Sequence, residues 1–348
     1  MSVGEKTYAR DIALPSFPEV ENDYLPDTAL VHFHFAPHAT AEHFDAASEH
    51  LKVADIYIPE AVGWDASELR DINAISKGDK KAIARAKFWN AKDPMGAYCD
   101  ARNDALARTY KPVLLVDASA DQRSYLTGQA YWKTFGVNAD DHLEKLADTM
   151  SVIARRAAMR DRIIVGNLGQ KVSELVVRHP RLAKKPTVNV LCTLGNAHGE
   201  VYDYLAAQEA TKENVQVSYW SSLGYHVPEQ ELVDTYRRQK APTRRQLIRA
   251  VTALALAGSE LPGLDEGRTL YNALALVSRK PDAHFILGAT MLELMMEEPE
   301  EALQWAFKTN TLKAEETADS QGLEYLCSMA TRADALLKTD ATFWRRAR

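Results

Sequence analysis

Short apolar runs that alternate with longer helix-forming stretches set the fold of most of this chain. The runs are rich in β-branched and aromatic residues, as strands are, and they occupy residues 29–35, 53–58, 112–116, 187–194 and 215–220. The stretches between them are charged, and their apolar residues recur at helical spacing. Strands that alternate with helices form a parallel sheet covered by helices. The sequence therefore predicts an α/β fold with a mainly parallel sheet flanked by helices.

Beyond residue 225 the strand signals stop and only helical periodicity remains. Apolar residues recur there at helical spacing in three segments, marked by Leu247, Val251 and Leu254, by Leu270, Leu274 and Val277, and by Leu287, Met291 and Leu294. Residues 1–28, by contrast, are punctuated by prolines and lack periodicity. We therefore expect three regions: an extended N-terminal arm over 1–28, an α/β core domain over 29–225 and an all-helical C-terminal extension or cap over 226–348.

The net charge and the cysteine content restrict the partners and the cellular compartment that we expect for this protein. The 348 residues include 42 basic and 48 acidic side chains, for a net charge of −6. Nucleic acids and acidic membrane surfaces bind concentrated basic faces, so neither is expected as a partner. The three cysteines are widely separated, and no apolar run reaches the roughly 18 residues of a membrane span. We therefore expect a cytoplasmic protein whose partner is a small molecule or a peptide.

Three ionisable side chains follow three of the predicted strands. His38 comes just after the first strand, Glu60 just after the second, and His198 after the run that ends near residue 194. Ligands of open parallel sheets bind beyond the carboxyl ends of the strands, where loops and helix N-termini converge. We therefore expect His38, Glu60 and His198 to meet in one cleft, although each taken alone could be a solvated loop residue.

A second candidate feature lies in the helical stretch from about 140 to 179, where an interruption is expected near Gly166 and Gly169. Arg160, Ile164 and Asn167 are spaced so that they share one helix face. An arginine and an asparagine on that face could bind an anion or a carbonyl oxygen. The alternative is a solvated stripe within a run of arginines, and the pattern allows both.

Histidines are concentrated between positions 32 and 50. His32 and His34 lie two apart on a predicted strand, so they face the same way, as does the metal-binding pair of amidohydrolase-type barrels. Such a barrel needs eight strand–helix units, and only five strands are predicted. A metal hydrolase using His32 and His34 is therefore a lower-ranked alternative. His43 and His50 lie seven apart on a helix flank and are expected to be solvated.

Four short motifs, in order, resemble one superfamily: the TraB/Tiki proteins, the erythromycin esterases and the haem-binding ChaN-like proteins. The motifs are FAPH, which contains His38; ADIYIPE, which ends at Glu60; RDRIIVGN, which contains Arg160, Asp161 and Asn167; and VLCTLGNAH, which ends at His198. Together they span residues 30–205. The sequence departs from the family pattern at Phe35, where the family has a glycine.

The resemblance implies an α/β fold with its polar site at the strand ends. In Tiki-like members the matching histidines and glutamate are proposed to hold a divalent metal for peptide hydrolysis. Esterase members activate water with similar residues and no clear metal requirement, and ChaN-like members bind haem. The metal ligands implied here are His38, Glu60 and His198, with zinc or manganese as the ion. Such a metal would lower the pKa of its bound water toward about 7.

We therefore expect a hydrolase of an ester or peptide bond, with His38, Glu60, Arg160 and His198 as catalytic residues and Asp161 and Asn167 in support. Without a metal, Glu60 would orient a histidine that acts as general base, and Arg160 would stabilise an oxyanion. The alternative is a non-catalytic protein that binds a ligand or partner on the same fold. Phe35, which stands in place of the family's glycine, favours this alternative. A homo-oligomer formed through the helical C-terminal region is also compatible with the sequence.

Overall fold

The computed structural model describes residues 28–36, 38, 41–90, 96–122, 136–195, 198–207, 214–219, 228–257, 283–311 and 320–340. The chain divides into two compact units. The α/β unit comprises residues 15–128 and 156–220, and the helical unit comprises residues 1–14, 129–155 and 221–348. The boundary falls within the long helix α5 (Ala139–Arg178). The predicted division into 1–28, 29–225 and 226–348 stays a prediction, and of the expected arm only Thr28 lies among the described residues.

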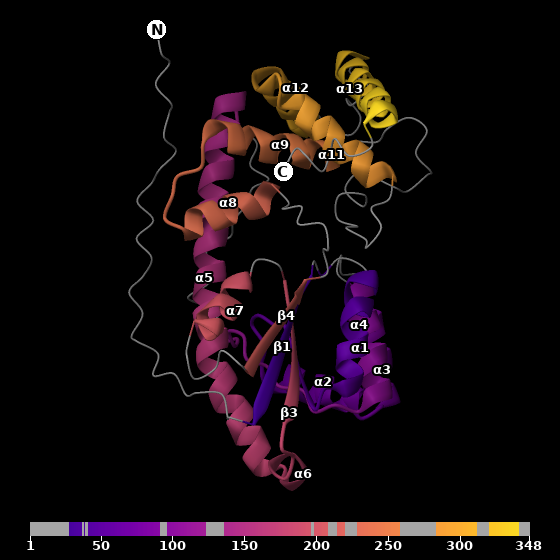
Figure 1. The fold of residues 1–348 in the computed structure, drawn as a ribbon, viewed down its shortest axis with the longest axis vertical. Coiled ribbons are helices and arrows are strands. Elements are labelled where there is room, and N and C mark those ends of the chain that lie inside the picture. The colour runs from indigo at the N-terminus through magenta and orange to yellow at the C-terminus, as the bar shows by residue number, and fades with distance from the viewer. Residues whose placement is uncertain are drawn as a thin grey trace. The chain divides into compact units, whose positions relative to one another are not determined.

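Four parallel strands form the sheet of the α/β unit (Figure 1). They are β1 (Ala29–Phe35), β2 (Ile56–Pro59), β3 (Val188–Leu194) and β4 (Val215–Tyr219), in the spatial order β2-β3-β1-β4. Phe35 pairs with both Leu194 and Tyr219, so three strands end at the same level. The predicted α/β fold with a parallel sheet flanked by helices is confirmed.

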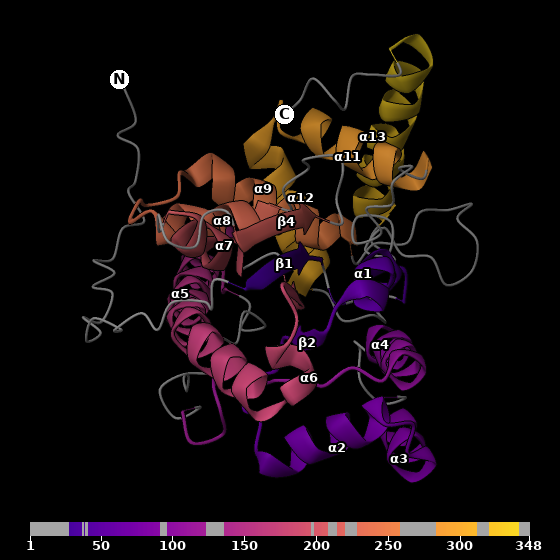
Figure 2. The same cartoon turned by 60° about the horizontal axis from the view of Figure 1, so that its bottom comes forward.

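Helices cover both faces of this sheet, as Figures 1 and 2 show. On one face, alternate residues of β1, including Val31 and Phe33, pack in one core with Ile164 and Leu168 of α5 and with Val201 of α7 (Gly199–Ala206). Alternation places every second strand residue on the same face.

The other face of the sheet packs against α1 (Ala41–Val53) and α4 (Gly96–Thr109). Tyr57 and Leu191 from the strands share a core there with Phe44, Leu51 and Leu106. Two further helices, α2 (Ala66–Ser76) and α3 (Lys80–Asn90), lie beside α4, and the short α6 (Pro180–Ala183) precedes β3. Both faces of β1 and β3 are thus covered, which is why these strands read as apolar runs.

The predicted strand at 112–116 is not formed as a regular strand. The segment makes one isolated parallel bridge, between Val113 and Tyr57. The Tyr57 amide donates to the Pro112 carbonyl, and the Leu114 amide donates to the Tyr57 carbonyl. Proline has no N–H to donate, and the Leu115 and Val116 carbonyls accept from side chains of α5 instead of from a strand. The segment therefore runs along β2 without extending the sheet's ladder.

Helix α5 continues through Gly166 and Gly169, where an interruption was expected. A glycine in a helix interior costs roughly 1 kcal/mol relative to alanine. Ile164, Leu168 and Val172 around the two glycines are fully buried against the sheet, and each such side chain contributes about 1.5–3 kcal/mol. Burial therefore outweighs the weak helix propensity of the glycines.

The helical unit has a core of its own. Its helices are the first part of α5 and α8 (Pro228–Arg237), α9 (Arg244–Ala257), α11 (Ala283–Met295), α12 (Pro299–Thr311) and α13 (Ser320–Thr339). Leu247, Val251 and Met291, which the periodicity singled out, are buried in that core. The predicted helical C-terminal region is confirmed, and the expected segment around Leu270, Leu274 and Val277 lies outside the described residues. No helix in the described part is long and apolar enough to cross a membrane.

Candidate functional site

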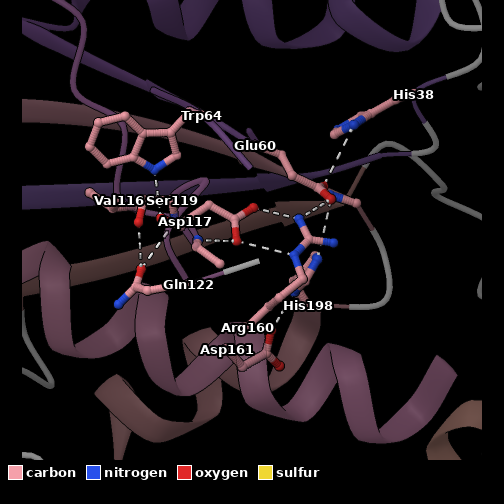
Figure 3. A network of polar contacts seen from close by, with 12 residues as sticks. His38, Glu60, Trp64, Val116, Asp117, Ser119, Gln122, Arg160, Asp161 and His198 are labelled. Carbon is pink, nitrogen blue, oxygen red and sulfur yellow. Dashed lines mark hydrogen bonds and ion pairs between the residues drawn. The ribbon is translucent and has the colours of Figure 1, made fainter. Parts of the chain in front are cut away.

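The four side chains expected to be catalytic lie together around the carboxylate of Glu60 (Figure 3). His38 follows β1, Glu60 follows β2 and His198 precedes α7 after β3, while Arg160 reaches them from α5. All four belong to the α/β unit. The shared level of the strand ends brings the first three together, as the strand-end rule predicts.

Both oxygens of Glu60 are in contact with donors. Oε1 accepts a hydrogen bond from Arg160 Nη2 at 2.6 Å and lies 3.3 Å from His198 Nε2. Oε2 accepts from the backbone N–H of Gly195 at 2.6 Å and lies 3.6 Å from His38 Nδ1. The two histidines therefore sit on opposite oxygens of one carboxylate.

Positive neighbours keep Glu60 ionised. Burial by itself would raise the pKa of this carboxyl, but His198, through its charge and its hydrogen bond, and then Arg160 lower it well below its ordinary value. A buried carboxylate with an adjacent guanidinium and an imidazolium is stable in its charged form. Glu60 is thus a fixed negative charge at the centre of the cluster.

Arg160 is held by a second carboxylate, Asp117, which sequence reasoning missed. Arg160 Nε donates to Asp117 Oδ1 at 3.1 Å, and Arg160 Nη2 donates to Asp117 Oδ2. Burial opposes the charge on Arg160, but Asp117 and Glu60 raise the pKa of the guanidinium. Asp117 directly follows the apolar run 112–116, so the strand-end rule that selected His38 and Glu60 could also have selected Asp117.

His198 is held as a cation between two carboxylates. Its Nδ1 is hydrogen-bonded to Asp161 Oδ1, and both side chains are almost completely buried. Burial lowers the pKa of His198, but the charge of Glu60 and the hydrogen bond to Asp161 outweigh it and raise that pKa to about 9. Asp161 therefore fixes the ring of His198.

His38 is held as a neutral base. Its ring stacks on Tyr98 of α4, with centroids 4.3 Å apart, a contact that the sequence did not predict. Burial lowers the pKa of His38 to about 4, although Glu60 opposes this. Nδ1 faces Glu60, and among the described residues no group lies within hydrogen-bond distance of the buried Nε2.

Asn167 contacts none of these charged groups. Its side-chain amide donates to the Val116 carbonyl at 2.8 Å. One turn further along α5, Lys171 donates to the Leu115 carbonyl at 2.8 Å and lies over the ring of Trp64. Asn167 thus supports the site by fastening the segment that leads into Asp117.

The other histidines of the 32–50 cluster lie on the α1 face of the sheet. His32 Nε2 and His34 Nδ1 both contact Ser218 Oγ of β4, at 2.8 and 3.0 Å. His50 stacks on His32 with centroids 3.9 Å apart, and His43 is fully buried. The expectation that His43 is solvated is therefore wrong, because α1 packs on the sheet and leaves this side chain no exposure to water.

A divalent metal fits the three expected ligands poorly. Both Glu60 oxygens already accept strong hydrogen bonds, one of them from a guanidinium. His198 carries a proton where a metal would need a lone pair. Within the described part of the chain, no group of three or more His, Cys, Asp or Glu side chains is arranged to hold a metal ion.

No protein-family model matches this chain, and neither a curated protein nor a solved structure does. The function of the chain is therefore inferred from the geometry of the site.

Proposed function

We propose that this protein is a hydrolase that cleaves an ester or peptide bond with water. The observation that carries the proposal is the pair of histidines on opposite oxygens of Glu60, whose pKa values lie at about 4 for His38 and about 9 for His198. Two titratable groups whose environments shift their pKa values in opposite directions are typical of the base and the acid of an active site. At neutral pH, His38 accepts a proton and His198 donates one.

The reaction follows from these two charge states. His38 Nε2 removes a proton from a water molecule as the water oxygen bonds to the carbonyl carbon of the substrate. The bond from that carbon to the leaving oxygen or nitrogen then breaks, and the leaving group takes a proton from His198 Nε2. The products are a carboxylic acid and an alcohol or amine, and the proton held by His38 restores His198 through solvent.

The surrounding charges prepare both histidines for these roles. Glu60 faces His38 Nδ1 and so favours the tautomer that leaves Nε2 free to accept a proton. Asp161 keeps His198 protonated and oriented. Arg160, fastened to Asp117, holds the Glu60 carboxylate in place between the two rings. We further propose that the chain is related to the TraB/Tiki and erythromycin-esterase superfamily, because these residues follow the order of its motifs.

The metal-dependent form of the reaction is the less favoured one. A metal at His38, Glu60 and His198 would have to displace Arg160 from Glu60 and the proton from His198. Elemental analysis of protein purified without chelator, together with activity before and after EDTA, decides between the two forms. The metal-free form requires that EDTA leave the rate unchanged.

The test of hydrolysis uses panels of p-nitrophenyl esters and fluorogenic peptides. His38→Ala and His198→Ala should each lower kcat/KM by at least about 100-fold, the usual contribution of a general acid or base. His179→Ala, at an exposed histidine in the same unit, is the matched control and should retain the wild-type rate.

The pH dependence provides a second, independent readout. The rate should rise as His38 loses its proton near pH 4 and fall as His198 loses its proton near pH 9. A wild-type protein that hydrolyses neither panel would instead favour the non-catalytic binding protein. No disulfide joins any of the three cysteines, which supports our further proposal of a cytoplasmic location.

A further inference from the structure

Arg102 is a cation beside the candidate site that the proposed reaction does not use. It lies on α4 four residues after Tyr98, so the two side chains share one helix face. Tyr98 is the residue whose ring stacks on His38. Arg102 is therefore one helical turn from the residue that orients the general base, and its charge contributes to the lowered pKa of His38.

Arg102 forms no ion pair with a described residue, although the charge of Glu68 acts on it. Its Nε donates to the Asn103 side-chain oxygen at 3.2 Å. Its electrostatic neighbours are Cys99, Tyr57, Tyr98 and Glu68, of which only Glu68 is an acid. Among the described residues, no Asp or Glu oxygen lies within ion-pair distance of its guanidinium, whereas Arg160 has two such carboxylates.

Burial opposes the charge on Arg102, but its neighbours, Glu68 among them, raise the pKa of the guanidinium. Arginine stays protonated at any physiological pH, so Arg102 remains a cation. Its guanidinium is bonded to no carboxylate of the described residues, which leaves it able to bind an anion that arrives from solution. The planar fork of five N–H donors matches a carboxylate, which it binds through two parallel hydrogen bonds.

A second group near Tyr98 also lacks a partner. His38 Nε2 is buried and has no hydrogen-bond partner among the described residues, and the His38 ring stacks on Tyr98, one helical turn from Arg102. We propose that the substrate of this site carries a carboxylate and that Arg102 binds it while His38 activates the attacking water. This inference rests on the proposed hydrolase function and names its substrate class.

The kinetic experiment compares charged and neutral forms of the same substrates. The probes are 3-acetoxybenzoate, 4-acetoxybenzoate and mono-p-nitrophenyl adipate, each paired with its methyl ester, which removes only the negative charge. We expect wild-type kcat/KM for at least one acid to exceed that for its methyl ester by about tenfold or more. Arg102→Gln should abolish this preference, and Arg102→Lys, which keeps the charge without the fork, should retain part of it.

A binding experiment separates this inference from the hydrolase proposal. Adipate and 4-hydroxybenzoate are titrated calorimetrically into the wild type, His38→Ala and Arg102→Gln. Binding that survives His38→Ala and falls at least about tenfold in Arg102→Gln supports the carboxylate site even if no ester is cleaved. Ester hydrolysis without any charge preference, together with equal or absent binding in wild type and Arg102→Gln, would overturn the inference and leave the hydrolase proposal standing.

Folding controls accompany both experiments. Arg108→Gln, at an exposed arginine of the same helix, should change neither charge preference nor binding. Because Arg102 forms no ion pair with a described residue, Arg102→Met should unfold at the same urea concentration as the wild type or at a higher one. Marked destabilisation of both Arg102→Met and Arg102→Gln would indicate a structural role and count against the inference.

Discussion

The Glu60 carboxylate is held from several directions at once. Arg160 and the Gly195 amide each donate to it at 2.6 Å, and His38 and His198 lie at its two oxygens. A carboxylate fixed in this way has little freedom to rotate, so the positions of both histidine partners depend on it. The site should therefore be sensitive to a displacement of a few tenths of an ångström at Glu60.

The substitution Gly195→Ala, which adds one carbon atom, tests whether the Glu60 carboxylate must be held in place. A Cβ at this position would lie 3.0 Å from Glu60 Oε2, and the carboxylate cannot withdraw without losing its contacts. We expect kcat/KM to fall at least about 100-fold and the unfolding free energy to fall by about 1–3 kcal/mol. Steady-state kinetics and urea unfolding measure the two effects.

Gly199→Ala is the matched control for that substitution. Apart from the backbone of its own helix and its chain neighbours, no atom of the described residues lies within 4 Å of a Cβ placed there, and Gly199 is the first residue of α7. Alanine should leave the rate unchanged and add up to about 1 kcal/mol of stability. Equal rates for the two alanine variants would show that Glu60 need not be held in place.

At this residue scale, the order of strands in the sequence led to three side chains that the structure brings together. His38, Glu60 and His198 were identified because the carboxyl ends of parallel strands meet at one edge. Tyr98 could not be found in this way, because it lies on a helix that follows no predicted strand. Its role depends on how α4 packs beside His38, which helical periodicity does not specify.

At the scale of elements, α5 does more than cover the sheet. Asn167 and Lys171 fasten the backbone of 112–116, while Arg160 on the same helix binds Asp117 just beyond that segment. The apolar run 112–116 predicted a strand, but this prediction is wrong. Hydrophobicity alone does not reveal where the carbonyl groups of a segment find hydrogen-bond donors. The side chains of α5 supply those donors, so the segment stays fixed without joining the ladder.

Asn167→Ala should separate this anchoring role from a catalytic one. The substitution leaves the buried Val116 carbonyl without its side-chain donor, so we expect the unfolding free energy to fall by about 1–2 kcal/mol. Because Asn167 contacts none of the charged groups at Glu60, kcat/KM should stay within about threefold of wild type.

The control for that variant is Gln170→Ala, an exposed position of the same helix that pairs only with Glu174 among the described residues. It should change the unfolding free energy by less than about 0.5 kcal/mol. A stable Asn167→Ala protein with a 100-fold slower reaction would mean that Asn167 acts on the substrate, as its shared helix face with Arg160 first indicated.

At the scale of the molecule, each unit has its own core, and the site belongs to the α/β unit alone. Alternation of strands with helices was enough to predict the sheet, and helical periodicity without strand signals was enough to predict the helical C-terminal region. Neither pattern could predict that residues 129–155 group with the helical unit, because α5 is one uninterrupted helix across that boundary. Helical periodicity is the same whichever core a turn of the helix faces.

The charge states of the buried histidines also make the stability of the whole chain depend on pH. Burial lowers the pKa values of His34 and His38 to about 4, whereas Glu60 and Asp161 raise that of His198 to about 9. In the unfolded chain all three titrate near 6.5. Between pH 6.5 and 4 the unfolded chain binds more protons, so stability falls as the pH falls. Between pH 6.5 and 9 the folded chain binds more, so stability falls as the pH rises.

The unfolding free energy should therefore pass through a maximum near pH 6.5, and urea unfolding followed by circular dichroism from pH 4 to 10 would measure it. A rise in the pKa of His198 from 6.5 to about 9 corresponds to about 3 kcal/mol that is lost by the alkaline end of this range. His198→Ala should remove this alkaline slope, whereas His179→Ala should keep it. A wild-type protein whose stability rises steadily from pH 6.5 to 9 would contradict the imidazolium state of His198, and with it the assignment of His198 as the acid.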